Sequence, residues 1–511
     1  MNPRRSFLRK IGYLAGIALL LVPLFWLSQP STIDVNGAKG TPGGKLSQLR
    51  EGYHLGQADL GEIDPAGQTV KLATLGMSGI AADILWEKAN LYKMKKDWTD
   101  LSATLKQIRK LQPNFIGVWR FQAWNLSYNV SHEFDDYRDR YRWVIRGIEF
   151  LKEGIKYNEH EPILQWDVGW FTGHKIGKSD EKKQFRKLFK EDDDFHGSRP
   201  MDQRDNWLVG REWFLAAEEL VDTEGVKVRG VDPVIFRSDA PMWMINYADA
   251  LEGDGTFGEV AKRAWGSALA DWQRFGRIEV PGTNGRMIRL GEEEVHQAAA
   301  LRLSAELEAL QPGLRRQIVA EKRAKLSPAQ REALDLPREK LTDKQYQLSL
   351  EAQERLRVAH AEVARRITGP KHGKALELAQ QIEDLEDLAG AIDRYREIVN
   401  YDYWYRRMQM EQTDEAVNAR KLVHAGDRAF NDADLLGARK GYEQGMALWR
   451  KALDRFPQLI GERTTGDTLM DVIKRYRQIL AESDEPFPKN FILQDVIDKH
   501  EIKDEPSPKK P

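Results

Sequence analysis

The sequence predicts an all-α protein built from paired helices, with one hydrophobic segment near its amino end. From Asp64 onward, apolar residues recur at spacings of three and four, which is the period of an amphipathic helix. Runs that alternate apolar and polar residues, as a half-buried strand does, are scarce. Of the 511 residues, 41% are hydrophobic and 31% are charged. This composition fits a body with a buried core and excludes a polytopic membrane protein.

The net charge and the cysteine content exclude several classes of partner and of chemical site. The chain has 78 lysines and arginines against 79 aspartates and glutamates, a net charge of −1. A near-neutral chain lacks the basic surface of a dedicated nucleic-acid binder, so we expect no nucleic-acid partner. The chain has no cysteine, which excludes disulfides, thiolate zinc sites, iron–sulfur clusters and cysteine nucleophiles.

The amino terminus predicts a membrane anchor. Residues 1–10 form a basic flank, and no acidic residue precedes Asp34. Residues 11–33 carry no charge, and their most apolar part, Ile11–Leu27, would reach about 25 Å as a helix, near the short limit for a bilayer core of about 30 Å. Because positive flanks stay inside, we expect a single-pass protein of the bacterial inner (cytoplasmic) membrane, with a cytoplasmic amino terminus and a periplasmic body.

Two alternatives concern how this segment is used. Signal peptidase prefers an Ala-x-Ala-like pattern of small residues after the apolar run, and Trp26–Pro30 is a poor match to it, so we favour a retained anchor over a cleaved signal. The string Arg4-Arg5-Ser6 resembles a twin-arginine export signal, although a plain basic flank explains it as well. All of these interpretations place the body outside the cytoplasm.

Residues 34–63 and residues 64–290 differ in composition and in the secondary structure that they predict. The first range contains a glycine-rich stretch, Gly37–Gly44, and predicts a flexible linker. The second range predicts successive helices, with Asp205 or Asp202 as a cap for one of them. The expected helices, including one in the range 413–482, are Ile80–Met94, Phe115–Tyr128, Pro162–Lys178, Asp180–Lys190, Asp205–Val221, Pro241–Gly253 and Glu415–Phe430.

Several of these helices, or the helices that follow them, carry a small residue, a large one four later, a small one three later and sometimes a proline. Small side chains at these positions let two helices approach closely. Three segments follow this pattern: Gly147/Leu151/Gly154, Ala261/Trp265/Ala268 and Gly445/Trp449/Ala452/Pro457. A fourth, Leu101/Leu105/Ile108/Pro113, fits the spacing but has larger residues at the close-contact positions. They resemble the second helix of the tetratricopeptide (TPR) repeat, over about 64–290 and again over 413–482. The resemblance implies a TPR-like solenoid of helical hairpins, and an irregular helical bundle is the alternative.

Two longer strings carry a second resemblance. Leu111–Ser131 and Tyr141–Asn158, together with the predicted anchor, resemble an uncharacterised family of single-span planctomycete membrane proteins that are sometimes labelled "iron-responsive element". The resemblance extends over most of the chain. It implies a membrane-anchored protein and no particular reaction.

Residues 291–412 are rich in charged residues, Ala and Leu, and aromatic residues are nearly absent until Tyr395. This composition predicts helices, which we expect at 293–310, 313–325, 343–367 and 374–410. They form either an inserted coiled-coil-like arm or long helices of the same solenoid. Residues 413–482 predict a further TPR-like pair, and the Pro- and Lys-rich residues 483–511 predict a disordered tail.

Three strings imitate catalytic motifs. Gly253–Arg263 has the glycine spacing of a kinase loop, but its flanks are helical, so it predicts a turn between two helices. Thr172–Ser179 is one residue short of a phosphate-binding P-loop and predicts a helix carboxyl terminus. Neither His132 nor His500 has a second histidine one turn later, as a zinc-protease helix requires. We therefore expect no cofactor and no resident metal.

The acidic cluster 191–196, with sequence EDDDFH, allows two interpretations. Its carboxylates and imidazole suit a hard cation or the acid–base pair of an envelope hydrolase. The alternative, which we favour, is a solvated helix end.

The best candidate for a binding surface lies among the dense aromatic residues of the early repeats. Repeat solenoids present the first helix of each pair along a concave groove, and polar residues on these helices suit a peptide or a glycan. The candidate groove residues are Arg120, Asn125, Asn129, Asp167, Trp170 and His174. Their alternative role is hydrogen bonding within the core.

These observations together predict a scaffold or assembly factor that binds envelope proteins or peptides, and no enzyme. The first alternative is an envelope hydrolase or metal-binding protein that uses the cluster 191–196. The second is a structural protein that forms a homo-oligomer through residues 291–412.

Overall fold

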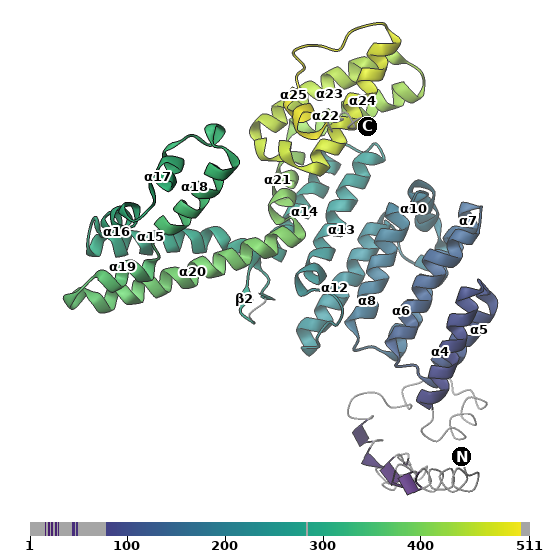
Figure 1. The fold of residues 1–511 in the computed structure, drawn as a ribbon. Coiled ribbons are helices and arrows are strands. Elements are labelled where there is room, and N and C mark those ends of the chain that lie inside the picture. The colour runs from purple at the N-terminus through teal and green to yellow at the C-terminus, as the bar shows by residue number, and fades with distance from the viewer. Residues whose placement is uncertain are drawn as a thin grey trace, which may run out of the picture. The chain divides into compact units, whose positions relative to one another are not determined.

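The computed structural model describes residues 78–282 and 285–501, with scattered positions between 16 and 49. Within these residues the regular secondary structure is helical except for one short antiparallel pair, Val280–Pro281 (β1) and Met287–Ile288 (β2). The all-α prediction is therefore confirmed. The chain divides into two compact units, Met1–Gly230 and Val231–Pro511, a boundary that falls inside the range 64–290 expected to form one block (Figure 1).

The predicted anchor, 11–33, and the predicted linker, 34–63, lie almost wholly outside the described residues. Among the helices that are described, none combines the length and the apolar character needed to cross a bilayer.

The first unit is a series of helices joined by short connections. In chain order its elements are α4 (Ser78–Met94), α5 (Trp98–Leu111), α6 (Ile116–Trp124), the π-helical turn η2 (Asn125–Asn129), the 3-10 turn η3 (Val130–Glu133), α7 (Tyr137–Tyr157), α8 (Pro162–Trp170), the π-helical turn η4 (Phe171–Lys175), α9 (Ile176–Lys178), α10 (Lys182–Glu191), α11 (Asp193–His196), the 3-10 turn η5 (Met201–Gln203) and α12 (Asn206–Glu224). Helix α4 packs on α5, α6 on α7, and α8 on both α7 and α12 (Figure 1).

Aspartates and glycines fix where these helices begin and how closely they pack. Asp205 accepts a hydrogen bond from the backbone N–H of Trp207, which confirms Asp205 rather than Asp202 as the cap of α12. A methyl group at Gly154 would lie 2.8 Å from the ring of Trp119, so the absence of a side chain lets α7 approach α6. Gly154 therefore has the close-packing role that its position in the predicted pattern implies.

The second unit contains the remaining elements. They are α13 (Pro233–Gly253), α14 (Glu259–Arg277), β1, β2, the 3-10 turn η6 (Leu290–Glu292), α15 (Glu293–Leu310), α16 (Leu314–Ala324), α17 (Pro328–Asp335), the 3-10 turn η7 (Arg338–Lys340), α18 (Asp343–Leu356), α19 (His360–Arg366), the 3-10 turn η8 (Gly369–Lys371), α20 (His372–Val399), α21 (Tyr401–Glu411), α22 (Asp414–Asn431), α23 (Leu435–Arg455), the 3-10 turn η9 (Pro457–Gly461), α24 (Arg463–Glu482) and α25 (Gln494–His500).

Two pairs of helices organise this unit. Helix α20 runs beside α15 within residues 291–412, a segment called the arm below, and α22 packs on α23 near the carboxyl end (Figure 1). A methyl group at Gly441 of α23 would lie 2.8 Å from the Cα of Gly426 on α22, so these two backbones nearly touch. The turn expected at Gly253–Arg263 is confirmed: Asp254–Gly258 joins α13 to α14, and Gly255 and Gly258 adopt positive φ.

Three expected helix boundaries are wrong. Helix α13 begins at Pro233 and continues through Pro241, because Asp232 caps it and Pro233 occupies the first turn. The helix expected over 343–367 breaks after Leu356, where Arg357 is extended, and resumes as α19. The helix expected over 374–410 breaks at Asn400, whose φ of 51° is left-handed.

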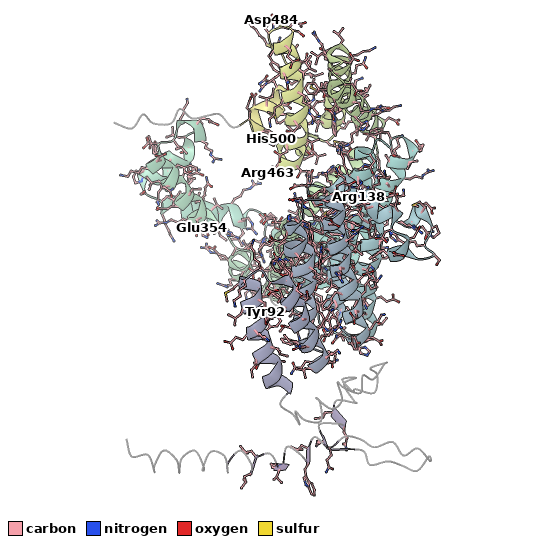
Figure 2. The ribbon with its side chains drawn as sticks, turned by 90° about the vertical axis from the view of Figure 1, so that its right-hand side faces the viewer. Tyr92, Arg138, Glu354, Arg463, Asp484 and His500 are labelled. Carbon is pink, nitrogen blue, oxygen red and sulfur yellow. The ribbon has the colours of Figure 1, made fainter. Side chains whose placement is uncertain are left out.

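The prediction of a disordered tail over 483–511 is also wrong for residues 483–501. Helix α25 packs on α24 and on η9, and its Val496 and Ile497 are buried. His500, labelled in Figure 2, bonds through Nε2 to the carbonyl oxygen of Ile460 at 2.7 Å. Residues 502–511 lie outside the described residues.

Candidate functional site

Two neighbouring helices of the first unit, α6 and α8, each continue into a five-residue π-helical turn, η2 and η4. Helices α6 and α8 contact each other, and α7 packs against both. Single π-helical turns inside helices are often found at functional sites. We call the surface formed by these segments the α6–α8 face. Its members are Arg120, Trp124, Asn125, Tyr128 and Asn129 from α6 and η2, and Trp166, Asp167, Trp170, His174 and Lys175 from α8 and η4.

An ion pair joins the two helices of this face. Arg120 is paired through both Nε and Nη2 with the carboxylate of Asp167, the second contact being 3.1 Å. Asp167 is buried, whereas 38% of the Arg120 side chain is exposed. Burial raises the pKa of Asp167, and the bond to Arg120 opposes that rise. The pair therefore holds α6 to α8 and still offers part of a guanidinium to solvent.

Stacked rings continue the face toward the π-helical turns. Trp166 stacks on Trp170 with ring centroids 5.6 Å apart, and Trp170 stacks on His174 at 4.8 Å. Trp124, which is 42% exposed, stacks on Tyr128 at 6.3 Å. Because their faces cover one another, these rings offer mainly their edges and polar atoms to any partner.

The Tyr128 hydroxyl connects the two turns. It lies 3.2 Å from Nδ1 of His174, and burial raises the pKa of Tyr128 to about 12. Burial also lowers the pKa of His174, and the neighbouring Lys178 and Lys175 lower it further. We therefore expect a neutral His174 that accepts the hydrogen bond of Tyr128 at neutral pH.

The two asparagines of the face, Asn125 and Asn129, bond to each other within the π-helical turn η2. Asn125 is buried, and its Oδ1 accepts a hydrogen bond from Nδ2 of Asn129 at 2.9 Å. This bond joins two side chains four residues apart and spans the π-helical turn η2. Of the six predicted groove residues, Asn125 is the least available to a partner.

Lys175 is the buried cation of this face. Its Nζ lies 3.3 Å from Nε2 of His132 and 4.8 Å from the centre of the Tyr128 ring. Burial lowers the pKa of Lys175, and nearby Glu181 opposes that shift. Among the described residues no carboxylate lies within ion-pair distance of Lys175, and its Nζ contacts the Tyr128 ring and His132.

The acidic cluster 191–196 has structural partners for its central residues. Asp192 caps α11 and accepts the hydroxyl of Tyr141 at 2.8 Å. Asp193 pairs with Arg204 at 2.6 Å, and His196 Nε2 lies 2.7 Å from the Phe189 carbonyl oxygen. Within the described part of the chain, no three His, Asp or Glu side chains gather as metal ligands would. The segment is therefore the end of α10 followed by the short helix α11, and its buried His196 departs from the expected solvated helix end.

The structure brings the predicted groove residues together in three sets: Arg120 with Asp167, Asn125 with Asn129, and Trp170 with His174. Sequence reasoning did not assign a site role to Tyr128, which lies at hydrogen-bond distance from His174, or to Lys175. The aromatic density around Tyr128 was visible in the sequence. The sequence does not predict the π-helical turns, because they depend on how α6 and α8 pack.

Comparison with known proteins adds no relative to this description. No family model matches the chain, and no curated protein or solved structure is significantly similar to it.

Proposed function

We propose that this chain is a single-pass protein of the bacterial inner membrane whose TPR-like body lies in the periplasm and binds an envelope protein or peptide at the α6–α8 face. The observation that carries the proposal is the pair of π-helical turns, η2 and η4, on two contacting helices. Such turns are less stable than regular helix and persist where they serve a function.

The side chains of the face support a peptide-like partner. Trp124 and Arg120 are partly exposed, and tryptophan and arginine are the residues that most often dominate binding energy at protein interfaces. The indole edges and the guanidinium suit the carbonyl groups and carboxylates of an extended segment. The Arg120–Asp167 ion pair and the Tyr128–His174 hydrogen bond hold the face rigid. A rigid face loses less conformational entropy when it binds a partner.

Photocrosslinking in cells tests this proposal. A photoreactive amino acid at Trp124 is expected to give one dominant protein adduct, identified by mass spectrometry. The matched control is Arg142 on α7, whose side chain is 77% exposed and which lies outside the face. Equal adducts from both positions, or none from Trp124, would contradict the proposal.

The absence of cysteine makes topology equally testable. A cysteine introduced at Ser483, which is exposed at the end of α24, is expected to react with an impermeant maleimide in spheroplasts without lysis. Reaction only after lysis would place the body in the cytoplasm and would refute the proposed location, independently of the binding site.

A further inference from the structure

The arm of the second unit contains a surface groove between α15 and α20. Its volume is about 410 Å³, and most of its exposed lining is apolar. The residues that form it include Ala300, Leu301, Ser304, Glu386, Ala389 and Gly390. The groove lies on one unit of the chain and is independent of the α6–α8 face.

The groove exists because small side chains meet where the two helices pack. Ala300, Ser304, Ala389 and Gly390 leave space that larger residues would fill. A Cβ added at Gly390 would meet only Arg394 Nη1, at 3.8 Å, so the direction of the missing side chain is open. Beside this space, 73% of Leu301 is exposed, which is a large apolar side chain without a covering partner.

The border of the groove on α20 is acidic. Between Glu383 and Asp393 the chain has five acidic residues and no basic residue. Glu386 pairs with His360 at 3.1 Å. Asp387 and Asp393 are exposed, and within the described residues no ion pair neutralises either of them. Two basic side chains also border the groove, Arg394, whose Nη1 lies beside Gly390, and Arg302 of α15, and the five acidic residues of α20 outnumber them.

We propose that this groove docks an amphipathic helix of a partner protein, with apolar residues on one face and lysine or arginine on its flanks. Apolar side chains at spacings of three and four would enter the groove and cover Leu301, as helix-in-groove complexes do. The flanking cations would lie over Asp387 and Asp393, where unpaired carboxylates attract them. An acidic or neutral helix lacks this second interaction.

The probe is a synthetic helix of leucine and lysine, about 18 residues long, which spans about 27 Å, and carries a fluorophore and a photoreactive residue. Added to the full-length chain, it is expected to bind saturably and more weakly as salt rises, since screening weakens exposed charge pairs. Its crosslinks are expected at residues 297–304 and 386–390. Crosslinks spread over other helices, or no saturable binding, would overturn the proposal.

Two substitutions on the same helix separate docking from a general change in α20. Gly390→Leu fills the groove and is expected to weaken binding of the probe at least about tenfold, while replacing a glycine inside a helix favours folding. The control is Gly373→Leu, where an added Cβ meets nothing within 4 Å and binding is expected to stay unchanged. Equal affinities for the two variants would overturn the proposal. Sedimentation showing a dimer that only Gly390→Leu dissociates would assign the groove to a second copy instead.

Discussion

In each unit, charged side chains join neighbouring helices, but the two arrangements differ in burial and in the number of charged groups. In the first unit, one arginine and one aspartate face each other and the arginine stays partly exposed. In the second unit, Arg407 and Arg420 lie among three carboxylates, of which Glu411 is fully buried. The first arrangement is balanced and open to solvent. The second, called the closed cluster below, is mostly buried apart from Asp249, and it places three carboxylates around two arginines.

The closed cluster ties together helices that the arm separates in sequence. Arg407 of α21 reaches Asp249 of α13 at 2.6 Å, and Arg420 of α22 binds Glu411. Arg420 Nε also lies 3.1 Å from Glu252 of α13. Because Nε donates to Glu411, neither oxygen of Glu252 accepts a well-formed hydrogen bond. A buried network of this kind fixes one arrangement of helices, whereas the α6–α8 face leaves groups available for a partner.

The largest expected effect is on stability, from breaking the closed cluster. Arg420→Ala leaves Glu411 and Glu252 buried without their shared cation, so we expect the free energy of unfolding of the second unit to fall by about 3–5 kcal/mol. Urea denaturation followed by circular dichroism measures this loss. The control is Arg463→Ala, which removes an exposed side chain of α24, labelled in Figure 2, and is expected to change little. Similar losses in both variants would remove the distinction between closed and open pairs.

The second effect concerns pH. Burial raises the pKa of Glu252 from 4.5 to about 8, with Glu411 and Asp249 adding to the rise and Arg420 and Trp265 opposing it. Since the folded pKa exceeds the unfolded one, this contribution to stability is fully present below about pH 4.5 and is lost as pH rises through 8.

We therefore expect the melting temperature of the second unit to fall between pH 6 and pH 9, a range that brackets the raised pKa. Glu252→Gln should reduce that fall, because a neutral amide cannot ionise. Glu397→Gln, at an exposed position of α20, should leave the pH profile unchanged. A Glu252→Gln profile as steep as that of the unaltered chain would contradict the assignment.

The smallest expected stability effect is at the open pair. Arg120→Met and Asp167→Asn are each expected to lower the free energy of unfolding by about 1–2 kcal/mol, with a coupling energy of about 1 kcal/mol in the double variant. The exposed part of Arg120 keeps this value low. A coupling energy as large as the loss at Arg420 would mean that the α6–α8 face is a structural cluster like the other.

The sequence predicted the all-α class and most helix positions, because amphipathic spacing and aspartate caps act locally. It also drew attention to the aromatic residues around Trp124 and Trp170. It missed the break at Asn400, because the flanking residues are all compatible with helix and only tertiary packing selects a left-handed asparagine there. It missed α25 because Val496 and Ile497 form too short an apolar pattern to stand out without η9 and α24 beneath them.

The π-helical turns and the charge count of the closed cluster were beyond sequence reasoning for the same reason. Glu252 and Glu411 are separated by the whole arm, so nothing in the sequence shows that both face Arg420. Likewise, the link between Tyr128 and His174 joins residues that lie 46 positions apart in the chain.

The most direct test of the proposed binding surface uses the photoreactive residue at position 124. The yield of its crosslinked adduct is compared between two variants that each carry one further substitution and have equal melting temperatures. With Trp170→Ala, which removes a ring of the α6–α8 face, the yield is expected to fall about tenfold, as loss of a dominant interface residue does. With Arg142→Ala, outside the face, it should not change. An adduct that forms equally well in both variants would show that the face is not a binding surface.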